Sequence, residues 1–166
     1  FQHISRAFLG LSLVFDLAPE ECRTALELPA ARELAQEFAE WVTPRYHTLW
    51  TQMFIACCQL GFNPPVGSHQ VPLLEVLSKH LPAVSVGLSL FDSLDILVSL
   101  TYAHGSPDGG KLAAELKPHS KGLAGLADRC LKIIHREPST LESWRAYRRY
   151  KGADVMQLLG AYAGVL

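Results

Sequence analysis

The sequence lacks the long apolar runs and the nucleophile or phosphate-binding motifs that mark several large classes of protein. No apolar segment approaches the roughly 18 residues that a membrane-spanning helix needs, because Arg, Asp, Gly or Pro interrupts each one. There is no G-x-S-x-G motif, and the segment SPDGGK (106–111) lacks the spacing of a Walker loop. We therefore expect neither insertion into a membrane nor an enzyme with a small-molecule substrate.

Metal-binding motifs are missing as well. The four cysteines form no C-x-x-C pair, and the seven histidines form neither H-x-x-x-H nor H-E-x-x-H. Cys57 and Cys58 are adjacent in a segment with helical character, where neighbouring side chains point about 100° apart and cannot easily bind one ion. The sequence thus predicts no metal and no cofactor, and buried thiols in a reducing compartment.

Sustained period-two alternation is also absent, which argues against strands, whereas apolar residues recur at helical spacing. In ELPAARELAQEFAEWV (27–42) the spacing places Leu34, Phe38, Trp41 and Val42 on one helix face, and we expect that face to be buried. Prolines stand at the expected helix ends. Helices are predicted near 3–17, 29–42, 46–61, 70–82, 92–104 and 153–166.

A repeated unit becomes visible when the chain is divided at its prolines. Pro19, Pro64 and Pro107 each follow an apolar helical segment, at intervals of 45 and 43 residues. A helical hairpin of about 40 residues must stack on its neighbours to bury its apolar face. The predicted fold is an all-α solenoid, a single array within a longer protein, and an ordinary helical bundle is the alternative. The repeats are expected near 3–45, 46–90 and 91–152, with a partial one at 153–166.

Charge is divided unevenly along the chain, although the net charge is only −1. Residues 1–42 carry seven acidic against three basic side chains, and residues 111–151 carry ten basic against four acidic ones. This division suggests that the later part of the chain faces a polyanion or an acidic partner.

Basic and aromatic residues interleave in REPSTLESWRAYRRYKG (136–152), which we expect to include a short helix. Guanidinium groups pair with phosphates and aromatic rings stack on unpaired bases, so this segment is a candidate for RNA contact. The alternative is a solvated helix whose aromatic rings dock on protein. The predicted RNA-binding residues are Arg145, Arg148, Arg149, Lys151, Trp144 and Tyr147, with Lys121, Lys132 and Arg136 as flanking contacts.

Four segments carry a resemblance to a known family: LWTQMFIACCQLGFNPP, PLLEVLSKHLPAV, LFDSLDILVSLTYAHGSP and ADVMQLLGAYAGVL. Together they resemble the organellar octotricopeptide and heptatricopeptide repeat proteins, which are related to the FAST-kinase-like and RAP-domain proteins. The chain departs from that pattern in showing no RAP-type C-terminal domain and no recurrent polar pair for reading single bases.

The resemblance implies a non-enzymatic α-solenoid that binds RNA inside mitochondria, with plastids as the alternative. It further implies a component of a mitochondrial ribosome or another large ribonucleoprotein, with ribosomal RNA and other protein subunits as partners. A second hypothesis is a scaffold that contacts only protein, such as an accessory subunit of a mitochondrial membrane complex.

Overall fold

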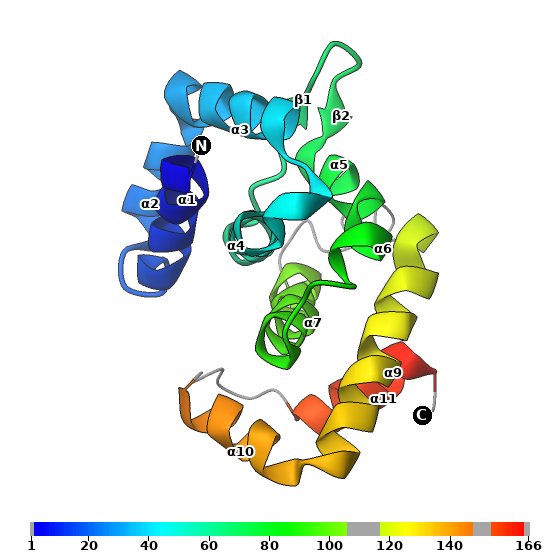
Figure 1. Ribbon diagram of the computed structural model, residues 1–166. Coiled ribbons are helices and arrows are strands. Elements are labelled where there is room, and N and C mark those ends of the chain that lie inside the picture. The colour runs from blue at the N-terminus through cyan, green and yellow to red at the C-terminus, as the bar shows by residue number, and fades with distance from the viewer. Residues whose placement is uncertain (1, 106–116, 148–153, 165–166) are drawn as a thin grey trace.

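The protein is mostly helical, in agreement with the predicted all-α class (Figure 1). The computed structural model describes residues 2–105, 117–147 and 154–164. Its elements are, in order, α1 (Gln2–Val14), α2 (Pro19–Glu27), α3 (Pro29–Trp41), a 3₁₀ turn (Pro44–Tyr46), α4 (His47–Leu60), β1 (Pro65–Val66), β2 (Val71–Pro72), α5 (Leu73–Lys79), α6 (Leu81–Val84), α7 (Leu90–Gly105), a second 3₁₀ turn (Lys117–His119), α9 (Ser120–Arg136), α10 (Pro138–Tyr147) and α11 (Val155–Ala163).

Three helices form a row at the centre of the molecule, with α1 on one side of α4 and α7 on the other (Figure 1). The stretch of α4 from Met53 to Cys58 consists of apolar residues only, and all six are buried. Phe8 of α1 stacks on Phe62, which follows α4, with ring centroids 5.1 Å apart. The hydroxyl of Ser5 donates a hydrogen bond of 3.1 Å to Gln52, which joins α1 to α4.

The segment after α4 folds back over it. Gly61 ends α4 in the left-handed conformation, with a φ of 62°, which glycine adopts without strain. The side chain of Asn63 then accepts a hydrogen bond of 2.8 Å from the Leu74 amide at the start of α5. The buried indole of Trp50 donates to the Leu77 carbonyl at 3.0 Å and so fixes α5 against α4.

Proline and turn residues explain where the observed elements differ from the predicted ones. The helix predicted over 3–17 ends at Val14, and α2, which was not predicted, begins at Pro19. The helix predicted over 70–82 is divided into α5 and α6. The expectation that the chain lacks strands is wrong. β1 and β2 form an antiparallel pair to which each contributes two residues.

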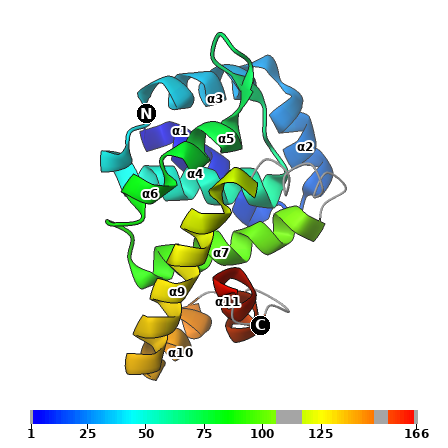
Figure 2. The ribbon, with the colours of Figure 1, turned by 90° about the vertical axis from the view of Figure 1, so that its right-hand side faces the viewer.

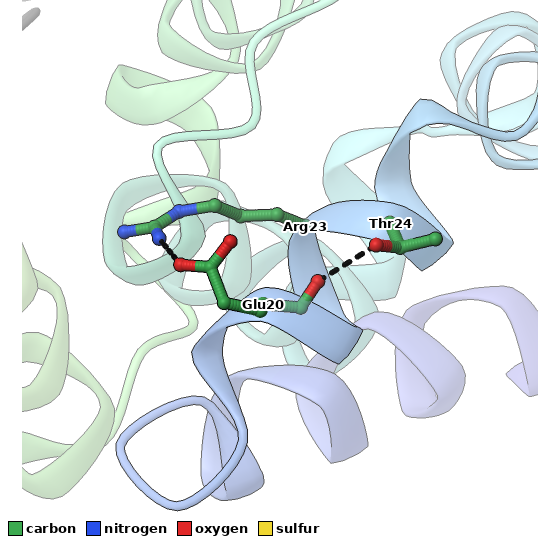
Figure 3. A network of polar contacts seen from close by, with 3 residues as sticks. All are labelled: Glu20, Arg23 and Thr24. Carbon is green, nitrogen blue, oxygen red and sulfur yellow. Dashed lines mark hydrogen bonds and ion pairs between the residues drawn. The ribbon is translucent and has the colours of Figure 1, made fainter.

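An exposed polar network accompanies α2 (Figure 3). Arg23 forms an ion pair with Glu20, and the Thr24 hydroxyl donates to the Glu20 carbonyl at 2.9 Å. The Arg23 guanidinium also lies 5.6 Å from the centre of the Phe15 ring. Because exposed ion pairs contribute little to stability, this network orients side chains more than it holds the fold together.

The predicted buried face of α3 is only half right. Phe38 and Val42 are buried as expected, but the structure leaves Trp41 66% exposed and Leu34 37% exposed. The face that packs on the rest of the protein consists of Ala31, Ala35, Phe38 and Val42 instead. The two larger side chains therefore lie on the outside of the molecule.

The last three helices lie together at the end of the molecule away from α3 (Figures 1 and 2). Helix α9 packs against α7, α10 and α11. Its Arg129 is turned inward and donates to the carbonyl oxygens of Ser85 and Leu88, in the turn that precedes α7. These bonds fix α9 to the central row.

Candidate nucleic-acid interface

Helix α9 has one buried face and one basic face. Leu123, Leu126, Cys130 and Ile134 are buried against the protein. Lys121, Lys132 and Arg136 are exposed, and their spacing of eleven and four residues places them together on the opposite side. We call these three residues the basic face. Arg136 stands 15 positions after Lys121, which corresponds to about 22 Å of helix.

The ion pair on the basic face is weak. Lys132 lies 2.6 Å from the carboxylate of Asp128, one turn earlier, and both side chains are largely exposed. Water screens such a pair, which stabilises a helix by roughly 0.3–0.5 kcal/mol. An approaching phosphate can therefore replace Asp128 as the partner of Lys132. In the part of the chain that the structure describes, neither Lys121 nor Arg136 forms an ion pair.

Helix α10 supplies fewer surface groups than the sequence predicts. Arg145 and Tyr147 are exposed, as RNA contact requires. Trp144 is 1% exposed, and its indole donates a buried hydrogen bond of 2.9 Å to Asp95 of α7. Its predicted role in base stacking is thus corrected, because protein atoms cover the ring. The predicted contacts Arg148, Arg149 and Lys151 lie outside the described residues.

A groove of about 650 Å³ adjoins the basic face. Its lining residues come from the end of α9, the start of α10 and the start of α11. Its polar lining residues are Lys132, His135 and Arg136, and its apolar ones are Leu131, Ile134, Pro138 and Met156. Nothing in the sequence motifs indicated this groove, because Met156 reaches it from a different helix.

The four thiols are buried, as expected, and the environment of Cys57, Cys58 and Cys130 favours the neutral form. Burial raises the pKa of Cys57 and of Cys58 well above the ordinary value of 9.0. Burial also raises the pKa of Cys130 to about 11, although the nearby charge of Arg129 and a hydrogen bond with Ser93 lower it in part. Since the thiolate is the reactive form, these cysteines are poor nucleophiles in the folded protein.

These shifts predict that the protein loses stability in alkaline solution. In the unfolded chain the Cys130 thiol releases its proton near pH 9, whereas the folded state retains it until about pH 11. The stabilisation is therefore complete below pH 9 and is lost as the pH rises from 9 to 11. Urea denaturation followed by circular dichroism should give a midpoint that falls over this interval. A Cys130→Ala variant should show a shallower fall, and a midpoint independent of pH would contradict the assignment.

The described residues, 2–105, 117–147 and 154–164, contain no group of three His, Cys, Asp or Glu side chains placed to hold a metal ion. Over the same ranges, no helix has the length and apolar character that crossing a bilayer requires.

Comparison with protein-family models, with curated proteins and with solved structures gave no match. The functional argument therefore rests on the residues of this chain.

Proposed function

We propose that this protein is a non-enzymatic helical-repeat protein that binds RNA through the basic face of α9. In this proposal α1, α4 and α7 are the equivalent first helices of successive repeats in an α-solenoid. Their side-by-side row supports that arrangement, because each begins one of the units expected from the proline intervals. On the resemblance to organellar repeat proteins, we propose that it works as a component of a mitochondrial ribosome or another large ribonucleoprotein.

One observation carries the proposal: three exposed cations share one side of a helix whose other side is buried. A helix held in this way presents its charges at fixed intervals, so that binding a phosphate backbone requires little reorganisation. Arg145 of α10 is a further exposed cation at this end of the molecule. The acidic side chains of α2 and α3 lie at the other end, which would orient an approaching polyanion toward α9 (Figure 1).

The proposal is tested by replacing Lys121, Lys132 and Arg136 with Gln and measuring RNA binding at several salt concentrations. Each lost phosphate contact lowers the slope of log K against log salt by about 0.7 for a single strand, so the triple variant should show a slope reduced by about two. Fluorescence anisotropy with a labelled single-stranded RNA of mixed sequence provides the measurement. The loss should be similar for RNAs of different sequence, because phosphate contacts do not distinguish bases.

A matched control removes the same charge elsewhere. Arg6, Arg32 and Arg45 are exposed and lie in the N-terminal part of the chain. Their replacement with Gln should leave the salt slope unchanged. An equal fall in both triple variants would indicate a general effect of net charge, and an unchanged slope in the α9 variant would overturn the assignment of RNA to this face.

A protein-only scaffold is the second candidate, and the burial of Trp144 favours it because it removes one predicted base-stacking ring. For a scaffold, the wild-type chain would not bind RNA even at low salt, while the α9 variant would lose an acidic protein partner.

A further inference from the structure

The outward side of α3 combines exposed apolar and exposed acidic residues. Leu34 and Trp41 are the exposed apolar residues, and Glu33, Glu37 and Glu40 are exposed beside them. The three glutamates follow one another at intervals of four and three residues, which lines them up along the helix. We call these five residues the acidic face of α3.

Exposure of Trp41 is the unusual element of this face. A tryptophan side chain that is 66% exposed leaves most of a large apolar surface in water. Elsewhere in the described residues the tryptophans Trp50 and Trp144 are buried and hydrogen-bonded. Tryptophan is enriched at the energetic centres of protein interfaces, where it fills a pocket on the partner.

The groove beside α9 has the complementary character. Leu131, Ile134 and Met156 give it an apolar lining, and Lys132 and Arg136 give the same lining a positive charge. Its volume of about 650 Å³ lies within the range of roughly 300–1,000 Å³ that is usual for ligand-binding sites. The groove is positively charged and the acidic face of α3 is negatively charged, so the two surfaces are complementary.

The two surfaces cannot meet within one molecule. Helix α3 lies at one end of the structure, and the groove lies at the other, beyond the central row of helices (Figures 1 and 2). We propose that the groove receives the acidic face of α3 from a second copy of this chain. Trp41 of one copy enters the groove of the next, while Glu33, Glu37 and Glu40 approach Lys132 and Arg136.

This contact joins two different surfaces, so it is heterologous. A heterologous contact leaves one free groove and one free acidic face after every addition, and it produces open chains of molecules unless the rotation closes a ring. The opposite charges steer the encounter and weaken it at high salt. Self-association is thus expected to rise with protein concentration and to fall as salt is added.

Two variants of the full 166-residue chain separate the surfaces. The first, W41A/E37K, removes the apolar anchor and reverses one charge of the acidic face. The second, K132E/R136E, reverses the two charges at the groove. Sedimentation velocity at low salt measures the mass distribution over a range of concentrations, and circular dichroism checks that each variant is folded.

We expect the wild-type chain to form species larger than a dimer, and each variant to self-associate about 30-fold more weakly, as for loss of an interface anchor. An equimolar mixture of the two variants should form dimers and nothing larger, because the first retains an intact groove and the second an intact acidic face. Val86→Ala, which trims another exposed apolar residue, is the control and should behave as the wild type.

Three outcomes would overturn this proposal: a wild-type chain that stays monomeric throughout, variants that associate as strongly as the wild type, or a mixture that forms no dimers. RNA binding is measured separately on W41A/E37K, which leaves the basic face of α9 intact, because K132E/R136E alters two of the three residues of that face. The RNA proposal fails if the wild-type chain does not bind RNA at low salt, or if the α9 substitutions lower the salt slope no more than the control substitutions do.

Discussion

Replacing Trp144 with alanine is expected to lower the free energy of unfolding by about 3–5 kcal/mol, the range for removing a large aromatic side chain from a core. The indole is 1% exposed and packs between α10 and the rest of the core. Its loss also removes the hydrogen bond of 2.9 Å that Trp144 donates to the buried carboxyl group of Asp95. Urea denaturation at pH 7, followed by circular dichroism, provides the measurement.

Two further substitutions separate packing from hydrogen bonding. Trp144→Phe keeps much of the ring but removes the donor to Asp95, and we expect a loss of about 1–3 kcal/mol. Trp41→Ala makes the same change of residue at a site that is 66% exposed, and it should lower the stability of the monomer by less than about 1 kcal/mol. Equal losses at Trp41 and Trp144 would contradict the burial that the structure assigns to them.

Replacing Arg129 with methionine is expected to lower the free energy of unfolding by about 2–4 kcal/mol, because hydrogen bonds from charged groups contribute roughly 1.5–3 kcal/mol each and methionine recovers part of the packing. The guanidinium joins α9 to the carbonyl oxygens of Ser85 and Leu88, which lose these donors in the variant. Chemical denaturation measures the loss.

Lysine at position 129 distinguishes charge from geometry. It retains the positive charge but not the planar fork that reaches two carbonyls together, so Arg129→Lys should recover only part of the loss. Arg136→Met, an exposed position on the same helix, is the matched control and should change stability by less than about 0.5 kcal/mol. A stability of Arg129→Met equal to that of this control would show that the two bonds do not hold α9 in place.

Apolar spacing was sufficient to predict the central helices. The residues from Met53 to Cys58 of α4 are almost all apolar, so any helical arrangement buries them, and the structure does so. The same rule failed for Leu34 and Trp41, because the hydrophobicity of a residue does not show how much of the helix surface the neighbouring elements cover. Here the neighbours cover only the narrower face that includes Ala35 and Phe38.

At the candidate interface, the sequence showed which residues are charged, but it did not show whether a side chain points inward or outward. The prediction counted Trp144 as a surface ring because arginines surround it, whereas its spacing of three residues from Leu141 was the better signal, since both are buried. No residue near Arg129 in the sequence indicated that its side chain points inward. Its acceptors stand 44 and 41 residues earlier in the chain, and only the tertiary fold brings them near.

The central position of α4 ties the parts of the molecule into one cooperative unit. Because α1 and α7 pack on opposite sides of the same helix, detachment of either one exposes apolar residues of α4 to water. Helix α7 in turn supports α9 and accepts the Trp144 bond through Asp95. An extended stack of repeats can fray from its ends, since each unit contacts only its neighbours. In this short row α4 is the neighbour of both α1 and α7, so the loss of either end exposes the same central helix to water.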